Sequence, residues 1–179
     1  MRKLKNSELK RISIEEFKQA PKLPVAIVLD NVRSLNNIGS VFRTSDAVMA
    51  EVIHLCGITA IPPHKDIHKT ALGATDSVRW EYFKETLESI RKLQNESYTI
   101  VAVEQTDDSI PLHTFRIEPG KKYALVFGHE IRGVQQEIVE HSDIRIDIPQ
   151  HGTKHSLNIS VCAGIVLWEV FKQLNLSNK

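Results

Sequence analysis

Three short apolar runs constrain the fold of this 179-residue chain more than any other feature. They occupy residues 25–29, 98–103 and 123–127, and none of them carries a charged side chain. A strand that is apolar at nearly every position must be covered on both faces, as strands are inside a parallel sheet flanked by helices. These runs therefore predict an α/β fold with a mainly parallel sheet.

Segments with helical spacing alternate with the runs and support this fold class. The capping-box pattern of Ser13 and Glu16 predicts a short helix after Ser13. We expect Asn37 to cap a helix over residues 38–48, and residues 86–94 to form an amphipathic helix. Further helices are expected just after Gly133 and over residues 159–170. Such alternation is typical of α/β domains.

The remaining strands and one polar segment complete the predicted order of elements. Strands are expected at residues 52–55 and 143–149, with a further short one at 78–82, and residues 64–70 read as a loop or a single helical turn. No repeat or linker interrupts the pattern. A length of 179 residues suits one domain. We expect a basic helical extension over residues 1–22 and one catalytic domain over residues 23–175.

The charge distribution is informative only at the N-terminus. The formal net charge of the chain is +1, so no overall field indicates a nucleic-acid partner. The first residues nevertheless cluster cations, and the cluster is either a solvated, frayed terminus or an arm that contacts phosphates. The cations are Arg2, Lys3, Lys5, Lys10 and Arg11.

The two cysteines, Cys56 and Cys162, both stand among apolar residues. They are typical of core positions in a reduced protein, so a cytoplasmic location is expected. No apolar run approaches the ~20 residues that a membrane span requires, and the N-terminus lacks the apolar core of a signal peptide. No membrane partner is expected.

The expected ligand site follows from the fold class. In parallel sheets, ligands bind beyond the carboxyl ends of the strands. Four polar segments stand at such ends: residues 30–37, 104–107, 128–130 and 150–158. We expect these segments to form one site.

Several familiar chemistries fit these segments poorly. Residues 36–40 contain a single glycine, too few for a dinucleotide or P-loop fingerprint. Histidines four residues apart occur at 64 and 68 and again at 151 and 155, but in loop-like sequence without a nearby cysteine, so no metal site is expected. Ser156 lacks the Gly-x-Ser-x-Gly turn of a nucleophile and is interpreted as a helix cap.

Arg43 has two possible roles. It lies about two turns into the helix expected after Asn37, where its planar guanidinium could face a phosphate or carboxylate beyond the strand ends. The alternative is a surface salt bridge to Glu51 or Asp46.

Three motifs in fixed order give the chain a resemblance to a known family. Residues 37–44 read NIGSVFRT, residues 125–133 read LVFGHEIRG, and residues 148–158 read IPQHGTKHSLN. Together with residues 69–74 (KTALGA), they resemble the SpoU (TrmH) branch of the SPOUT superfamily of RNA ribose 2′-O-methyltransferases. The match covers about residues 25–170. One departure is Gln150, where the family usually has methionine.

The resemblance implies a fold detail, a cofactor and a partner. It implies that the C-terminal part of the α/β domain threads through a loop as a deep trefoil knot, and that the protein is a homodimer. It also implies that S-adenosylmethionine binds in the knot. The implied cofactor-binding residues are Gly128, Ile148, Leu157, Glu104, Gln105 and Thr106, with glycine at position 128 allowing close approach of the ligand.

The resemblance also assigns catalytic roles. It makes Arg43 the catalytic residue. Because a free guanidinium is too basic to accept a proton readily, our hypothesis is that Arg43 aligns the ribose by binding the neighbouring phosphate and stabilises the developing alkoxide. Asn37 and Glu130 would fix Arg43, while Ser156 and Asn158 would position the ribose. The N-terminal cations and Arg43 would bind RNA.

The implied RNA substrate is the least specific part of the resemblance. The short basic extension, in place of a separate RNA-recognition domain, favours tRNA over rRNA. An rRNA substrate, a non-catalytic RNA-binding protein and an enzyme that methylates a base nitrogen are the alternatives.

Overall fold

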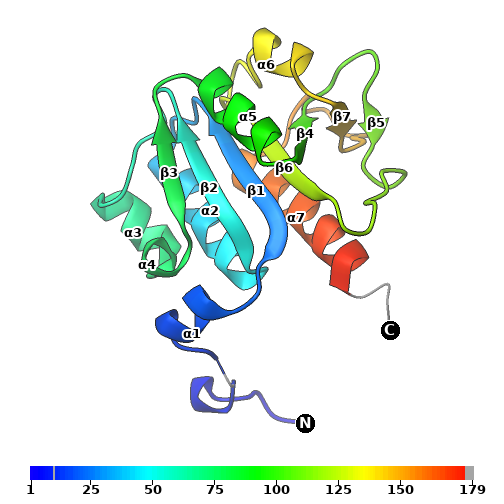
Figure 1. Ribbon diagram of the computed structural model, residues 1–179. Helices are drawn as coiled ribbons and strands as arrows, with labels where there is room; N and C mark the ends of the chain where they lie inside the picture. Colours follow the sequence, from blue (N-terminus) through cyan, green and yellow to red (C-terminus); the bar gives the residue numbers. More distant parts are fainter. Residues whose placement is uncertain (10, 176–179) are drawn as a thin grey trace.

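The computed structural model describes residues 1–9 and 11–175, and it contains one seven-stranded sheet (Figure 1). The strand order is β3-β2-β1-β6-β4-β7-β5, and each pairing is parallel. The strands are β1 (Leu23–Asp30), β2 (Ala50–Cys56), β3 (Trp80–Phe83), β4 (Tyr98–Val103), β5 (Ile110–Pro111), β6 (Lys122–Phe127) and β7 (Ile144–Asp147). The predicted α/β fold with a parallel sheet is confirmed.

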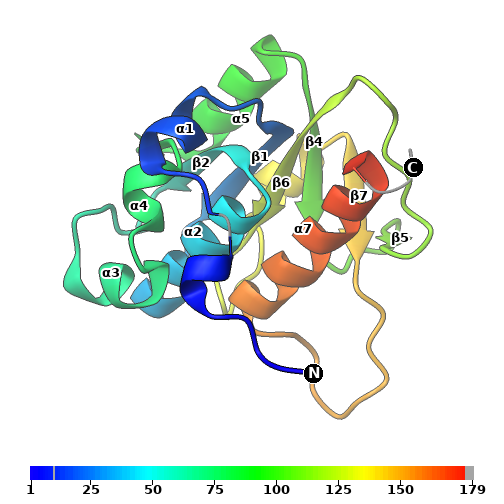
Figure 2. The same cartoon turned by 90° about the horizontal axis from the view of Figure 1, so that it is seen from below.

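Helices cover both faces of the sheet, as Figure 2 shows. Helices α2 and α7 pack on one face with α3 and α4 beside them, while α5 and α6 pack on the other. The helices are α1 (Ile14–Gln19), α2 (Leu35–Ala47), α3 (Lys65–Ala71), α4 (Ala74–Ser77), α5 (Thr86–Asn95), α6 (Gln136–Glu140) and α7 (Ile159–Asn175), with a 3-10 turn η1 (Asn6–Glu8) before them.

Strand β1 shows why the apolar runs are uninterrupted. Its alternate side chains Val25, Ile27 and Leu29 belong to the core under α2 and α7. Ala26 and Val28 point into the second core, under α5 and α6. All five are fully buried. Burying each of the larger side chains contributes about 1.5–3 kcal/mol, so both faces of this strand stabilise the fold.

Two helix caps differ from the prediction. Helix α2 begins at Leu35, and the hydroxyl of Ser34 accepts a hydrogen bond from the Asn37 backbone N–H at 3.4 Å. Ser34 is therefore the cap, which leaves the Asn37 side chain available for other contacts. At the start of α7, the Oδ1 of Asn158 accepts from the Ser160 N–H at 2.9 Å, so Asn158 and not Ser156 caps this helix.

Other elements also differ from the sequence prediction. Residues 65–71 form helix α3 rather than a loop or single turn, and β3 covers residues 80–83 rather than 78–82. The two-residue strand β5 was not predicted. The capping box of Ser13 and Glu16 is confirmed. In the part of the chain that the structure describes, no helix is long and apolar enough to cross a membrane.

Helices α2 and α3 cross in close contact at Gly39. A Cβ atom at this position would lie 2.1 Å from the Thr70 Oγ1 and 2.3 Å from the Ile67 carbonyl oxygen. The Thr70 hydroxyl also donates to the Asn36 carbonyl at 3.1 Å. Glycine is thus required at position 39 because α3 lies against the backbone of α2.

This crossing predicts that Gly39→Ala destabilises the protein. Alanine in a helix normally stabilises by about 0.5–1 kcal/mol relative to glycine, but here overpacking is expected to lower the free energy of unfolding by about 1–3 kcal/mol. Urea unfolding at fixed protein concentration measures the change. Ser40→Ala, the matched control on the same helix, should stay within about 0.5 kcal/mol of the wild type. A Gly39→Ala variant as stable as the wild type would contradict the crossing.

Candidate active site

The carboxylate of Glu130 links the loop after β6 to the start of α2. It accepts hydrogen bonds from the backbone N–H groups of Arg33 at 3.1 Å and Ser34 at 2.9 Å, and from the Asn37 Nδ2 at 3.0 Å. An anion at a helix N-terminus also interacts favourably with the helix dipole. Glu130 therefore holds α2 against a loop more than 90 residues away in sequence.

Asn158 extends this link to α7. Its Nδ2 donates to the Asn37 Oδ1 at 3.2 Å, while its own Oδ1 caps α7. Glu130, Asn37 and Asn158 thus form one hydrogen-bonded unit, the Glu130–Asn37–Asn158 junction. In it, Asn37 of the first motif bonds to Glu130 of the second and to Asn158 of the third.

The hydrogen bonds at the junction control the ionisation of Glu130. Partial burial by itself raises the pKa of this carboxyl group. The hydrogen bonds from its own N–H, from Ser34 and Arg33, and from Asn37 outweigh burial and hold the pKa below its usual value. The ionised form is therefore the one that the folded protein favours.

The loop after β6 folds back on itself at Gly128. His129 and Gly133 exchange two backbone hydrogen bonds of 3.0 and 2.8 Å. A Cβ atom at Gly128 would lie 2.0 Å from the Gly133 carbonyl carbon and 2.1 Å from the Val134 nitrogen. The chain's own packing therefore requires glycine at position 128, a reason that the sequence did not indicate; close approach of a ligand to this glycine stays a prediction.

Two further carboxylates hold the remainder of this loop. Glu104 Oε2 accepts from the Val134 N–H at 2.8 Å, and Asp30 Oδ2 accepts from the Gln135 N–H at 2.8 Å. Asp30 is fully buried and also accepts from the Thr86 hydroxyl at 2.6 Å. Sequence reasoning assigned no role to Asp30, although a carboxylate directly after a fully apolar strand was a usable signal.

A cavity of about 520 Å³ lies between these segments. Its walls come from residues 103–105, 127–133, 146–148, 150, 155–159 and 162. Among the expected cofactor residues, those that line the cavity are Gly128, Ile148, Leu157, Glu104 and Gln105. Thr106 is not among the lining residues, and its hydroxyl donates to Asp108 at 2.8 Å instead. Gln150 and Ser156 stand in the wall as well.

Arg43 lies outside this network. Its side chain is exposed on α2, and it makes no hydrogen bond or ion pair with any residue that the structure describes. The alternative prediction, a surface salt bridge from Arg43 to Asp46 or Glu51, is wrong. Asp46 instead accepts a hydrogen bond from the Ser77 hydroxyl, and Glu51 faces the Lys122 Nζ at 3.8 Å. The expected contacts of Arg43 with Asn37 and Glu130 are also absent, since those two bond to each other.

The other predicted residues are arranged as follows. Lys3, Lys5 and Arg11 are exposed, and the Arg2 guanidinium pairs with Glu8 at 2.6 Å. Lys10 lies outside the described residues. Within the described ranges 1–9 and 11–175, no group of three His, Cys, Asp or Glu side chains could hold a metal ion.

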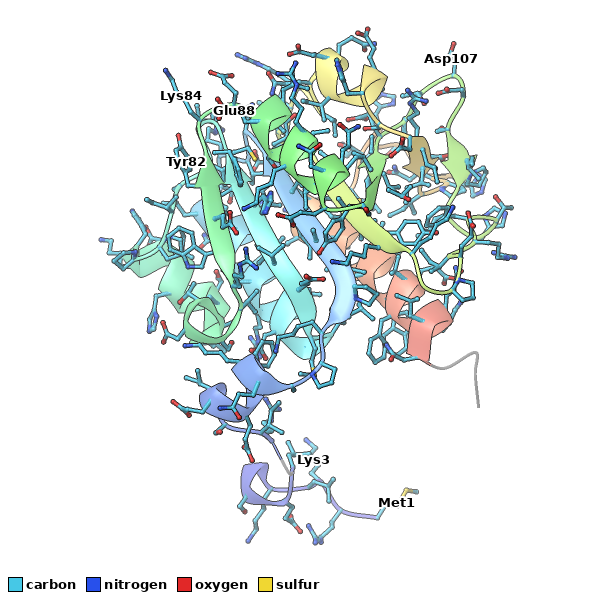
Figure 3. All side chains as sticks on the ribbon, in the orientation of Figure 1. Met1, Lys3, Tyr82, Lys84, Glu88 and Asp107 are labelled. Atoms are coloured by element: carbon cyan, nitrogen blue, oxygen red, sulfur yellow. The ribbon has the colours of Figure 1, made fainter. Side chains whose placement is uncertain are left out.

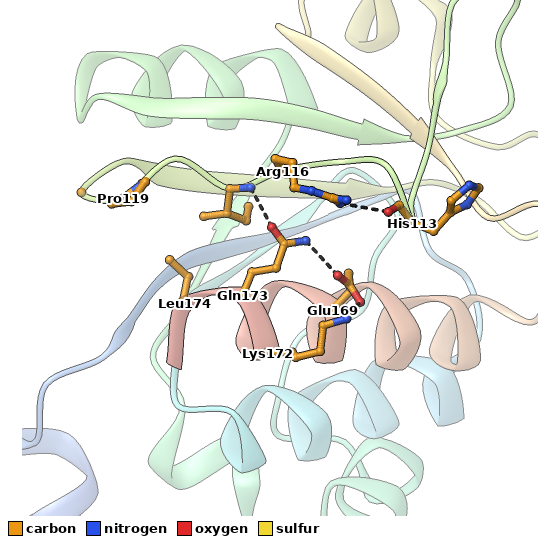
Figure 4. A pocket seen from close by; sticks show the side chains of 9 residues that line it. His113, Arg116, Pro119, Glu169, Lys172, Gln173 and Leu174 are labelled. Atoms are coloured by element: carbon orange, nitrogen blue, oxygen red, sulfur yellow. Dashed lines mark hydrogen bonds and ion pairs between the residues drawn. The ribbon is translucent and has the colours of Figure 1, made fainter. Parts of the chain in front are cut away.

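A second cavity, of about 560 Å³, lies between the end of α7 and residues 113–120 (Figure 4). The Gln173 side chain accepts from the Ile117 N–H at 2.9 Å and donates to the Glu169 Oε1 at 2.8 Å. Arg116 donates to the His113 carbonyl at 2.9 Å. The Ile117–Gln173 bond, with a second from the Gln173 Nε2 to the Phe115 carbonyl at 3.0 Å, joins the loop to α7 at this cavity, away from the three motifs.

Comparison with known proteins gives a consistent result. Residues 24–168 match the model of a family described as the SpoU rRNA Methylase family. A tRNA (guanosine(18)-2′-O)-methyltransferase of Aquifex aeolicus is 33% identical over 170 residues, 92% of this chain and 76% of the relative. A 23S rRNA (guanosine-2′-O-)-methyltransferase RlmB of Neisseria meningitidis is 29% identical over 164 residues, 87% of this chain and 61% of the relative.

A similar structure has been solved with a bound ligand. The AdoMet-bound rRNA methyltransferase from Sinorhizobium meliloti superposes with a TM-score of 0.79 at 27% sequence identity. The likeness covers 92% of this chain and 62% of that one.

The lowered pKa of Glu130 predicts a pH-dependent stability. Because ionisation is favoured in the folded state, the stabilising contribution is present above the unfolded pKa of 4.5 and is lost as the pH falls through the lower folded value. Glu130→Gln should therefore lower the free energy of unfolding at pH 7 by roughly 1–3 kcal/mol. Chemical denaturation from pH 3 to pH 7 should show that the difference in free energy of unfolding between the wild type and Glu130→Gln shrinks below about pH 4.5.

The matched control is Glu140→Gln, at an exposed position at the end of α6. It should leave the pH dependence close to that of the wild type. A Glu130→Gln variant whose deficit is the same at pH 3 and pH 7 would contradict the role of the ionised carboxylate.

Proposed function

This chain belongs to the SpoU rRNA Methylase family of RNA ribose 2′-O-methyltransferases, and we propose that it uses S-adenosylmethionine to methylate a ribose hydroxyl of tRNA. The observation that carries the proposal is that Asn37 of the first motif bonds to Glu130 of the second and Asn158 of the third, and that these two residues line the cavity. The Aquifex relative, a tRNA methyltransferase, and the basic N-terminus support tRNA; the Neisseria relative keeps rRNA as the second candidate.

The cavity fits the proposed cofactor. Its volume of about 520 Å³ is in the range of small-ligand sites, and the similar Sinorhizobium meliloti structure is described as AdoMet-bound. Ile148 and Leu157 would supply apolar contacts, and the backbone at Gly128 and the side chains of Glu104 and Gln105 would supply polar ones. When bound, S-adenosylmethionine supplies an electrophilic methyl group.

Arg43 is proposed as the catalytic residue. A ribose hydroxyl must lose its proton as its oxygen becomes a nucleophile, but a guanidinium with a pKa above about 12 does not accept that proton. Arg43 instead donates hydrogen bonds to the neighbouring phosphate and stabilises the negative charge that develops on the oxygen. The phosphate accepts the proton. That Arg43 has no partner among the described residues supports this role.

The junction acts on Arg43 through the helix and not by contact. Glu130, Asn37 and Asn158 fix the first turn of α2, and Arg43 follows two turns later on the same rigid element. Ser156, in the cavity wall, positions the ribose. Holding the reacting atoms at about 3–3.5 Å in line contributes several kcal/mol to catalysis.

A homodimer is proposed because α7 exposes an apolar row. Val161, Ile165 and Trp168 follow one another at helical spacing and are 51%, 40% and 56% exposed. A second copy of this chain would cover the row and place groups near the cavity, which opens beside the start of α7.

We also propose a basic extension over residues 1–22, a catalytic domain over 23–175, and a trefoil knot in the C-terminal part.

Arg43→Ala should abolish methyl transfer while leaving binding intact. With labelled S-adenosylmethionine, we expect the wild type to label purified total tRNA, and Arg43→Ala to lower turnover at least about 100-fold. Arg43→Lys should also be slow, because lysine lacks the bidentate fork. The dissociation constants for cofactor and RNA should change only a few-fold.

Arg91→Ala, at an exposed position on α5, is the control and should keep full activity. Full turnover by Arg43→Ala would refute the catalytic assignment. Label entering rRNA but not tRNA would move the substrate to rRNA.

Ile165→Glu should convert the proposed dimer to monomers, because a charge would be buried in an apolar interface. Sedimentation equilibrium measures this, and methyl transfer should fall with it. Ile58→Glu makes the same substitution at a residue 62% exposed outside α7, and it should leave the dimer intact. A wild type that sediments as a monomer would refute the dimer.

A further inference from the structure

A groove runs along the β3 edge of the sheet, away from the cofactor cavity. It consists of two adjoining hollows of about 520 and 530 Å³ that share Thr75, Asp76 and Trp80. One hollow lies against α3 and the Pro62–Pro63 turn, and the other reaches Lys18 and Lys22 at α1. Figures 1 and 2 place α1, α3 and α4 together along this edge. We call this surface the β3-edge groove.

The groove is positively charged although the chain as a whole is nearly neutral. Four cationic side chains line it against two carboxylates: Lys18, Lys22, Lys65 and Arg79 against Glu51 and Asp76. Glu51 faces the Lys122 Nζ at 3.8 Å, which offsets part of its charge, and Arg79 is offset in turn by its ion pair with Glu81. Lys18, Lys22 and Lys65 therefore supply the positive excess over Asp76. His64 and His68 stand on the α3 side. A polyanion is therefore the ligand that the groove favours.

Trp80 gives the groove an aromatic surface. Its indole is half-buried at the point where the two hollows meet, next to Pro62 and Pro63 in the first hollow. Stacking of a nucleobase on an aromatic side chain contributes to binding of unpaired RNA without requiring a particular sequence. An aromatic floor between cationic walls is the arrangement that binds a base and its flanking phosphates together.

The N-terminal segment reaches the groove only at α1. In Figure 3 the chain from Met1 and Lys3 leads into α1, which forms one wall of the groove. Lys3, Lys5 and Arg11 are exposed on this approach. The exposed cations Lys3, Lys5 and Arg11 thus precede the cationic groove along the chain, with Glu15 and Glu16 exposed between Arg11 and Lys18.

We propose that the β3-edge groove binds the substrate RNA outside the target nucleotide, with Lys18 and Lys65 on phosphates and Trp80 against an unpaired base. The proposal rests on the proposed RNA methyltransferase function and adds a contact surface to it. Because the groove lies apart from the cofactor cavity, it contributes to RNA affinity and not to the chemical step.

The experiment compares the wild type with Lys18→Ala/Lys65→Ala in RNA binding and methylation of total tRNA. The double variant should bind tRNA roughly 5–20-fold more weakly near 0.15 M salt, and the slope of log K against log salt should be shallower by about 1.5. Turnover at saturating RNA and the dissociation constant for S-adenosylmethionine should not change. The KM for RNA should rise with the dissociation constant.

Lys84→Ala/Arg91→Ala removes the same charge from exposed positions outside the groove and should leave affinity and salt slope near the wild type. RNA should quench the fluorescence of Trp80, so the quench should be lost in Trp80→Phe but kept in Trp168→Phe.

Each contrary outcome has a distinct meaning. A wild type that methylates RNA while Lys18→Ala/Lys65→Ala keeps its KM and salt slope would overturn the groove alone. A wild type that binds no RNA would overturn the proposed function and the groove with it. Loss of self-association in the groove variant, with unchanged RNA affinity, would assign the groove to a second copy of the chain and overturn the proposal.

Discussion

The carboxylate of Glu130 is the interaction on which the site depends. Three N–H donors from the start of α2 converge on it, and Asn37 passes the connection on to Asn158 at the start of α7. Elements far apart in sequence thereby meet at the carboxyl ends of β1 and β6. Because a carboxylate at a helix N-terminus is favoured both by hydrogen bonds and by the dipole, one side chain fixes the orientation of two helices.

The same principle shapes the cavity. Three carboxylates hold the loop after β6: Glu130 through α2, Glu104 through the Val134 N–H, and Asp30 through the Gln135 N–H. The loop is therefore organised before any ligand arrives, which reduces the entropic cost of binding. Arg43, by contrast, is left exposed on a rigid helix, where it can meet an RNA phosphate. A fixed cavity beside an unengaged cation suits a reaction that depends on positioning.

Much of this arrangement was predictable from the sequence, because buried parallel strands can be recognised as uninterrupted apolar runs. The strand ends then placed Glu104, Gly128 and Asn158 correctly at one cavity. The caps at Ser34 and Asn158 were missed because several neighbouring polar side chains compete for each helix start. The packing reason for Gly128 depends on how the loop after β6 folds back onto Gly133, and the partner of Asp46 depends on contact with the distant Ser77. The β3-edge groove could not be predicted from the sequence either, because the residues that line it are scattered over positions 18–80.

Digestion of methylated tRNA or rRNA to nucleosides, followed by mass spectrometry, tests the central claim most directly. We predict that the methyl group transferred by the purified protein resides on a ribose 2′-oxygen, and that Arg43→Ala gives none. A methylated base would mean that the cavity and Arg43 serve a different acceptor atom. The absence of any methylated nucleoside, with cofactor and RNA both bound, would contradict the catalytic role assigned to this site.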